Sequence, residues 1–286
     1  MEENNLYNTS LVPINNNALI KVSNSIAITN KLFTEMAEFY FNKFRGIIEE
    51  DNFFGGWRPE EMLFYLNRAI ECNPNVVEYY LERASLSYSN DIARIEDYTK
   101  SIELDNNCVE AYVGRGYSKV QLKDYEGAFQ DYSRAIVIDD KNVSAYINRI
   151  SLYKIVKDYP GALQDYAKII PLDSGTEYYF ERIDLKSEMG DLTGALKDID
   201  YFIEIDSCPP YYYYSIRAEL KGKMNDFSGM IGDYSKAIEL ALKEDEIINK
   251  TIASLYIARS ESRKKVGDLI GAEQDQEKVR EIENAI

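Results

Sequence analysis

A segment of fourteen residues recurs along this chain at a nearly constant interval. The first copy, KDYEGAFQDYSRAI, begins at Lys123, and the second, KDYPGALQDYAKII, begins 34 residues later at Lys157. Further copies begin at Gly190, Asn225 and Gly267. A fixed period of this size indicates a solenoid, in which each unit buries its apolar face against its neighbours. The repeat therefore predicts a solenoid and favours binding over catalysis as the function.

Each unit shows apolar residues at helical spacing, then a turn containing Gly, Asp or Asn, then a second helical run. Gly and Pro are sparse, at 15 and 7 of 286 residues, which suits a mostly helical chain with short turns. The array of repeats is predicted to span residues 77–286. Its units are placed near 77–108, 109–142, 143–175, 176–209, 211–244 and 253–286.

The region before the array is less regular. Residues 32–76 are interpreted as a degenerate first repeat, with its first helix at 32–49 and its second beginning at Pro59. Residues 1–31 are expected to be an N-terminal extension. Its first half is expected to be disordered, and the sequence leaves open whether 16–31 forms a short helix or a strand.

Three large aromatic residues gather in the sequence DNFFGGWR, which is expected to be the loop of this first repeat. They are Phe53, Phe54 and Trp57. The loop either folds back to cap the first repeat or presents an exposed hydrophobic anchor to a partner. The second possibility supports an alternative function, a self-assembling structural scaffold that uses this loop.

An arginine and an aspartate recur at equivalent positions in every unit. They are 16 residues apart in five units and 14 apart in the first. Arginine can bind a carboxylate with two hydrogen bonds while its stem is buried, and a ligand contact would not need the same pair in every unit. We therefore predict a structural ladder rather than a ligand site, with pairing within a unit or to the next. The residues concerned are Arg83, Asp97, Arg115, Asp131, Arg149, Asp165, Arg182, Asp198, Arg217, Asp233, Arg259 and Asp275.

Small and aromatic residues in the unit 109–142 resemble the pattern of the tetratricopeptide repeat family. These residues are Tyr112, Gly116, Tyr125, Ala128, Tyr132 and Ala135. The resemblance covers about three quarters of the chain and recurs in register, which makes it specific. It implies an all-α, right-handed α-solenoid of antiparallel helix pairs, with about six repeats after the degenerate one. Members of this family typically bind peptides or extended protein segments on the concave face, without a cofactor.

The resemblance and the helical spacing together predict which residues line the concave groove. Tyr117, Phe180 and Tyr212 are expected to be aromatic anchors, and the acidic residues to attract a basic segment. A groove that is merely solvated, or filled by residues 1–31, is the alternative. No basic clamp for a chaperone C-terminal carboxylate is present. The predicted lining is Glu110, Val113, Tyr117, Val120, Gln121, Ser151, Lys154, Ile155, Phe180, Asp184, Glu188, Tyr212, Glu219 and Lys223.

The charge and composition limit the classes of partner and of chemistry. The net charge is −16 and no basic stripe is present, so we expect neither nucleic acid nor membrane as a partner, but a basic or neutral peptide or protein. The sequence has no histidine and its three cysteines form no CxxC pair, so we expect no enzyme activity, no metal and no cofactor. The polar N-terminus does not resemble a signal peptide. We expect a cytoplasmic protein with reduced thiols, either monomeric or weakly self-associating.

Overall fold

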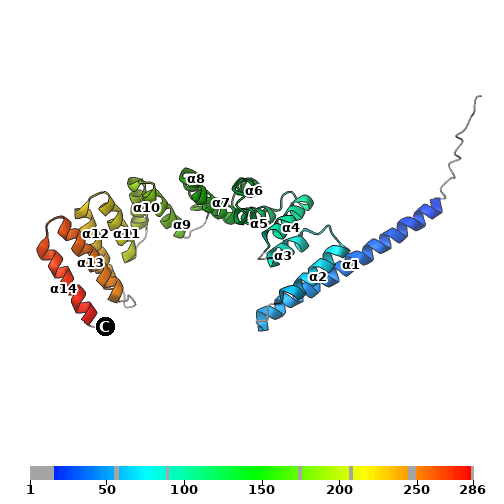
Figure 1. The fold of residues 1–286 in the computed structure, drawn as a ribbon, viewed down its shortest axis with the longest axis horizontal. Helices are drawn as coiled ribbons and strands as arrows, with labels where there is room; N and C mark the ends of the chain where they lie inside the picture. The colour runs from blue at the N-terminus through cyan, green and yellow to red at the C-terminus, as the bar shows by residue number, and fades with distance from the viewer. Residues whose placement is uncertain are drawn as a thin grey trace, which may run out of the picture. The chain divides into compact units, whose positions relative to one another are not determined.

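The computed structural model describes residues 16–54, 58–87, 90–172, 176–205, 209–243 and 249–284, with side chains described from residue 26 on except for 50–54. This part of the chain consists of helices joined by turns and contains no strand. In chain order the helices are α1 (Asn16–Phe54), α2 (Pro59–Cys72), α3 (Val77–Leu86), α4 (Asp91–Leu104), α5 (Val109–Gln121), α6 (Tyr125–Ile138), α7 (Val143–Val156), α8 (Tyr159–Ile169), α9 (Glu177–Glu188), α10 (Leu192–Ile205), α11 (Tyr211–Lys223), α12 (Phe227–Ala241), α13 (Asn249–Lys265) and α14 (Leu269–Asn284) (Figure 1).

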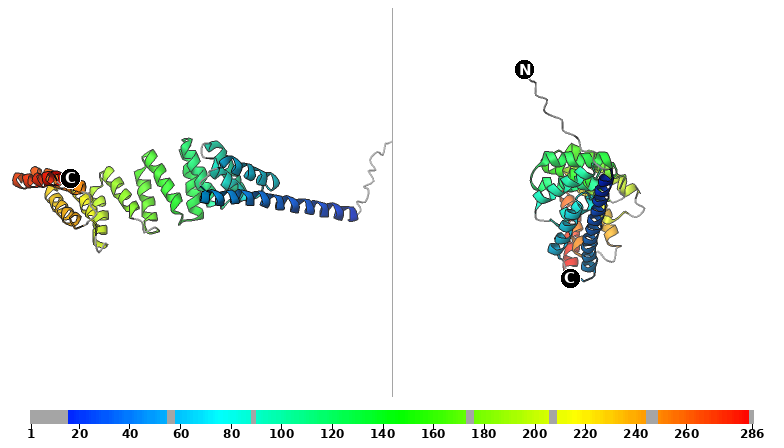
Figure 2. Two further views of the ribbon diagram at one scale, coloured as in Figure 1. Left: turned by 90° about the horizontal axis from the view of Figure 1, so that it is seen from below. Right: turned by 90° about the vertical axis from the view of Figure 1, so that its right-hand side faces the viewer.

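Successive helices pack as antiparallel pairs: α1 with α2, α3 with α4, α5 with α6, α9 with α10, α11 with α12 and α13 with α14. Hydrogen bonds between side chains join α7 to α8 in the same way. Figure 2 shows α13 and α14 side by side at the C-terminal end. The predicted all-α solenoid of helix pairs is confirmed. The first helix of each pair is called the A helix, and the second is called the B helix.

The helices group into two units. One unit ends at Asn148 and the other begins at Arg149, so the division falls inside α7. The first unit holds the N-terminal helix pair and the repeats built from α3 to α6, and the second holds the repeats from α9 to the C-terminus.

The turn between the A and B helices repeats with the sequence. Asp124 begins the B helix α6 as its N-cap, and its carboxylate accepts a 3.0 Å hydrogen bond from the backbone N–H of Gly127. Such a cap satisfies one of the free N–H groups at a helix start. Lys123, just before it, has a positive φ of 64°. Four other turns have the same capping bond, with caps at Asp158, Asp191, Asp226 and Asp268.

The arginine of each A helix binds the aspartate of its own B helix. Arg115 donates from Nε and Nη2 to the two carboxylate oxygens of Asp131, over 2.9 and 2.7 Å, and Asp131 is only 3% exposed. This two-point geometry is the strong form of a charge-assisted hydrogen bond. The same pairing joins Arg83 to Asp97, Arg149 to Asp165, Arg182 to Asp198, Arg217 to Asp233 and Arg259 to Asp275.

The remaining guanidinium nitrogen reaches back to the preceding repeat. Nη1 of Arg115 donates to Thr99 of α4 over 3.2 Å, and Nη1 of Arg217 binds Asp200 of α10 over 2.8 Å. Equivalent bonds join Arg83 to Asn67 and Arg259 to Ser235. One largely buried cation therefore holds three helices together: its own A helix, the B helix of its repeat and the B helix of the repeat before.

A second cation supports four of the six aspartates. It lies one helical turn after the arginine, so that Lys119 approaches Asp131 to 2.8 Å. Lys186, Lys221 and Arg263 do the same for Asp198, Asp233 and Asp275. Because a buried carboxylate is costly unless it is paired and hydrogen-bonded, this extra donor offsets the cost of burying the aspartate.

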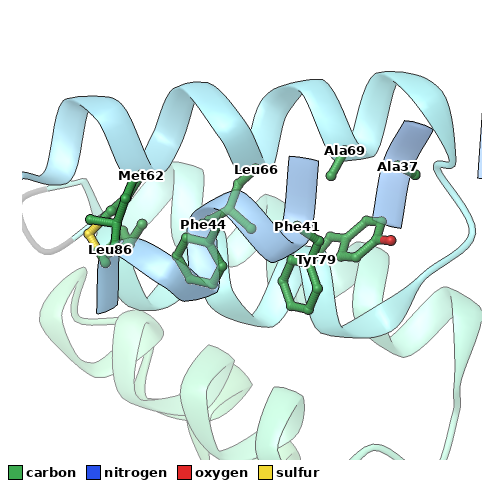
Figure 3. Close-up of a cluster of buried hydrophobic side chains, with 9 residues drawn as sticks. Ala37, Phe41, Phe44, Met62, Leu66, Ala69, Tyr79 and Leu86 are labelled. Carbon is green, nitrogen blue, oxygen red and sulfur yellow. The ribbon is translucent and has the colours of Figure 1, made fainter. Parts of the chain in front are cut away.

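The N-terminal repeat is built from α1, α2 and the start of the array. Ala37, Phe41 and Phe44 of α1 pack with Leu66 and Ala69 of α2, and all five are buried (Figure 3). Tyr79 and Leu86 of α3 complete the same cluster. This helix pair thus shares one core with the first regular repeat.

α1 begins earlier and ends later than the first helix that was expected from the sequence. The expected break at residue 31 is absent, because one helix runs from Asn16 to Phe54 without interruption. No Gly or Pro interrupts residues 16–45, so nothing in the sequence ends the helix there. At the other end, Asp51–Phe54 belongs to the last turn of this helix and not to the expected loop. Trp57 lies outside the described residues, as do the side chains of Phe53 and Phe54.

Replacing Gly190 by alanine should destabilise the fold by about 1 kcal/mol, because Gly190 has a φ of +81° that an L side chain adopts only with strain. Gly232→Ala is the matched control. Gly232 lies inside α12 with no atom near its Cβ position, so alanine there should stabilise by about 0.5–1 kcal/mol. Urea unfolding followed by circular dichroism measures both, and shifts of the same sign would contradict this account.

Arg115→Ala and Asp131→Ala should each destabilise the protein by about 1–3 kcal/mol, since each leaves a buried charged partner with fewer bonds. The double variant should lose less than the sum of the two, because the interaction is lost only once. Arg134→Ala is a suitable control, since Arg134 is exposed on the same B helix as Asp131 and its removal should change stability by less than about 0.5 kcal/mol. Strictly additive effects at Arg115 and Asp131 would show that the pair is not coupled.

Candidate functional site

The residues predicted to line the groove lie on four A helices, α5, α7, α9 and α11. Their side chains are accessible, since Val113, Val120 and Phe180 are half-buried and the other eleven are exposed. The two structural units divide them. Glu110, Val113, Tyr117, Val120 and Gln121 belong to the unit that ends at Asn148, and the remaining nine belong to the unit that begins at Arg149.

In the first unit, Glu110 and Val113 line a hollow of about 460 Å³. Tyr98 of α4, Gly114 of α5 and Ser144 at the start of α7 are among its other lining residues. The ring of Tyr98 packs directly on the backbone of Gly114, where a Cβ would overlap it. A glycine at this point therefore lets the B-helix tyrosine approach the floor of the hollow.

The first unit carries negative charge beside this hollow. Burial raises the pKa of Glu82, and the nearby carboxylates of Glu78 and Glu110 raise it further. Like charges disfavour one another, so the smaller contributions of Glu78 and Glu110 to this pKa shift indicate a local negative potential. Glu82 was missed by sequence reasoning, although its position one turn after Glu78 on α3 could have pointed to it.

A second hollow in the first unit, of about 400 Å³, lies between α1 and α3. Phe41, Arg45, Glu78 and Tyr79 are among its lining residues. The Arg45 guanidinium lies 4.7 Å from the centre of the Phe41 ring and forms a 2.5 Å ion pair with Glu78. Sequence reasoning also missed Arg45, because its partner is 33 residues away in the chain.

Tyr117 is the exposed aromatic residue of the predicted lining in the first unit. Its side chain is 45% exposed, and the Arg94 guanidinium lies 5.4 Å from its ring centre. Arg94 in turn pairs with Asp91 at the start of α4. A cation over a ring face is attracted by the ring electrons, so Arg94 fixes the orientation of Tyr117.

In the second unit, two predicted anchors lie next to each other on neighbouring A helices. The ring centres of Phe180 on α9 and Tyr212 on α11 are 5.9 Å apart. Phe180 also packs against Phe202 and Tyr213, at 5.7 and 5.4 Å, and both of those residues are buried. Tyr212 is 40% exposed. The buried rings thus hold a partly exposed aromatic pair at the surface, which we call the Phe180–Tyr212 pair.

Carboxylates lie on the same helices as this pair. Asp184 and Glu188 follow Phe180 on α9, and Glu219 follows Tyr212 on α11; all three are exposed. Glu181 accepts a 2.5 Å hydrogen bond from the buried hydroxyl of Tyr166. Burial, this bond and the charges of Glu181 and Asp184 all raise the pKa of Tyr166.

The lysines of the predicted lining differ in their contacts. Lys223 of α11 donates a 2.6 Å hydrogen bond from Nζ to Ser187 of α9, and thereby links two neighbouring A helices. Lys154 is exposed on α7. The second unit's part of the predicted lining therefore carries the aromatic pair, three carboxylates and two lysines, one of which is engaged by the protein itself.

The part of the chain that the structure describes holds neither a metal-binding cluster nor a membrane-spanning helix. Within it, no group of three or more His, Cys, Asp or Glu side chains is arranged to hold a metal ion. None of the described helices is both long and apolar enough to cross a membrane.

No family model matches the sequence, and no curated protein matches it either. Solved structures resemble its fold. The C-terminal part of a TPR repeat-containing protein from Cytophaga hutchinsonii superposes with a TM-score of 0.67 at 15% identity, over 86% of this chain and 96% of that one. A tetratricopeptide repeat protein from Parabacteroides merdae gives 0.51 at 17% identity, over 87% and 93%. PilF of Pseudomonas aeruginosa gives 0.50 at 16%, over 73% and 93%. At these identities the likeness shows the fold alone.

The buried tyrosine of α12 should make the fold sensitive to alkaline pH. Burial raises the pKa of Tyr234 from 10.0 to about 12, and Glu219 and Glu261 add to the shift. The hydroxyl of Tyr234 loses its proton at lower pH in the unfolded chain than in the folded one. Its contribution to the free energy of unfolding, on the order of 2 kcal/mol, is therefore complete below pH 10 and is lost as the pH rises towards about 12. Urea unfolding at several pH values should show a shallower alkaline loss in Tyr234→Phe, and identical profiles would refute this.

Proposed function

We propose that this chain, which has the fold of tetratricopeptide repeat proteins, is a non-enzymatic interaction module that binds a basic or neutral peptide, either extended or helical, on its A helices. The observation that carries the proposal is the Phe180–Tyr212 pair, which is partly exposed, backed by buried rings and accompanied by carboxylates. Partly exposed aromatic residues in a supported position are the residues that most often dominate binding energy at protein interfaces.

The chemistry of the second unit's surface favours a segment with a particular composition. The aromatic pair offers apolar area to a side chain of the partner, at low entropic cost because buried neighbours already hold the rings. Asp184, Glu188 and Glu219 would attract Lys or Arg beside that side chain and raise the rate of encounter. A basic segment with one large apolar residue meets both requirements.

The non-enzymatic part of the proposal has its own support. The sequence has no histidine, so it lacks the imidazole that serves as general base or metal ligand in many enzymes. The two described cysteines, Cys72 and Cys108, are half-buried free thiols, and burial raises the pKa of Cys108. A raised pKa disfavours the reactive thiolate.

Two alternatives have less support. The scaffold alternative rests on Phe53, Phe54 and Trp57, whose side chains lie outside the described residues. The alternative that residues 1–31 fill the groove requires a flexible segment, whereas residues 16–31 are part of the helix α1. The first fifteen residues are outside the described part of the chain.

Panning a displayed library of random peptides against the whole chain should enrich peptides that carry Lys or Arg beside a large apolar residue. The affinity of an enriched peptide, measured by fluorescence anisotropy, should fall as salt is added, because the screening length shrinks to about 8 Å at physiological ionic strength. Enrichment of acidic peptides, or of none, would contradict the proposal.

Phe180→Ala combined with Tyr212→Ala should weaken binding of an enriched peptide by about tenfold or more, as loss of an aromatic anchor typically costs at least 1–2 kcal/mol. Tyr201→Ala is the matched control, because Tyr201 is a similarly exposed aromatic residue on the B helix α10, outside the predicted lining. Unchanged affinity in the double variant, with its helix content retained, would place binding elsewhere.

A further inference from the structure

Residues 26–39 of α1 carry a concentration of exposed apolar side chains. Ile26 is 54% exposed, Phe33 47%, Met36 37% and Phe39 56%, and Leu32 is also exposed at 55%. Scattered apolar residues are normal on a protein surface, but a contiguous group on one helix marks an interaction site. The residues of this group are spaced with a helical period, and this spacing limits the kind of partner that can cover them.

The period is that of a coiled coil. Ile26, Phe33 and Tyr40 are seven residues apart, and Met36 follows Phe33 by three, as at the a and d positions of a heptad. In the sequence, Leu19 and Val22 continue both series towards the start of the helix. Leu32 and Phe39 fall at the flanking g position and widen the apolar face.

The line of the helix directly opposite the seam is polar in the same stretch, although Ile28 at a c position is apolar and exposed. The f positions of these heptads, farthest from the seam, are occupied by Asn17, Asn24, Lys31 and Glu38. Lys31 pairs with Glu35, and both are well exposed. An apolar seam with polar residues opposite is the pattern of a helix that pairs with one other helix.

In the C-terminal half of α1 the a positions of this seam, though not the exposed d-position Lys43, meet the neighbouring helices. Ile47, seven residues after Tyr40, is buried in the cluster shared with α2 and α3, and the Tyr40 ring lies 6.5 Å from that of Tyr65 on α2. The N-terminal part of α1 extends beyond the end of α2 (Figures 1 and 2). The exposed stretch is therefore a direct continuation of an established helix–helix contact.

We propose that residues 16–39 of α1 pair with the same residues of a second copy of this chain, as an antiparallel two-helix coiled coil. The stretch is self-complementary in that direction. An antiparallel register centred between residues 27 and 28 sets Ile26 beside Thr29, Phe33 beside Val22 and Met36 beside Leu19 of the second copy. Each a position then meets a d position. The paired stretch is 24 residues, or about 36 Å at 1.5 Å per residue.

Charge selects the antiparallel direction. The chain carries a net charge of −16, so a parallel pair would bring two acidic bodies side by side. The antiparallel pair places them at opposite ends of the coiled coil, separated by several times the screening length of about 8 Å. Within residues 16–39 the seam contains no charged residue, and an anionic lipid surface would find only Lys21 and Lys31 on residues 16–34.

The test is the mass of the whole chain in solution, measured by light scattering after size exclusion over a range of concentrations. The wild type should be a dimer at high concentration, and Ile26→Glu combined with Phe33→Glu should be monomeric throughout. Ile28→Glu is the matched control, because Ile28 is the most exposed apolar residue of this stretch, at 70%, but lies at the c position away from the seam. This variant should remain dimeric.

The direction of pairing has a separate readout. A parallel pair would bring Met36 of both copies together, so Met36→Cys would form a disulfide-linked dimer on mild oxidation, beyond any background from the native cysteines. The antiparallel pair separates the two positions by about 25 Å, far beyond disulfide reach, and predicts no added cross-link. A cross-link through residue 36 would overturn the direction.

Two further outcomes would overturn the proposal altogether. One is a wild type that is monomeric at every concentration, whether or not it binds uncharged or anionic lipid vesicles. The other is a dimer that survives Ile26→Glu with Phe33→Glu, which would place the interface elsewhere. Peptide binding by the second unit is independent of both, since the seam residues lie outside that surface.

Discussion

A largely buried arginine that binds three helices at once is the interaction on which the rest of this structure depends. Each guanidinium uses two nitrogens to hold the aspartate of its own B helix and, in four repeats, a third to reach the preceding B helix. The tyrosine one turn earlier lies over the same group, as Tyr112 does at 5.7 Å from Arg115. The planar, permanently charged fork of arginine suits this role, and lysine could not replace it. One side chain therefore contributes both to the pairing of helices within a repeat and to the packing of neighbouring repeats.

Because the buried arginines make the contacts within and between repeats, the accessible side chains of the A helices are free to vary. The buried positions repeat because each must satisfy the same carboxylate and fill the same space. The accessible positions change from repeat to repeat, from Val113 and Tyr117 in one to Phe180 and Asp184 at the equivalent places of another. Such variation on a constant frame is how a repeat protein acquires a distinct surface without altering its fold.

Much of the fold could be predicted because the sequence repeats it. The 16-residue spacing between arginine and aspartate, and the Gly, Lys or Asn before each capping aspartate, are local signals that recur five times. The contacts between repeats could not be predicted, because the acceptors of the third nitrogen are Asn67, Thr99, Asp200 and Ser235, with no common residue type. The ion pair of Arg45 with Glu78 joins segments 33 residues apart, and a single sequence carries no signal for it. The first helix was expected to begin at residue 32, but no Gly or Pro lies between residues 16 and 45 to separate it from the preceding segment.

The bonds by which four of the arginines reach the repeat before their own have a mechanical consequence. Each such bond joins two neighbouring repeats only. A pulling force applied along the chain would therefore act in full on every contact between repeats. Because the Arg–Asp pairs lie within repeats, an end repeat that lost its contact with the next would leave its neighbours' own pairs in place.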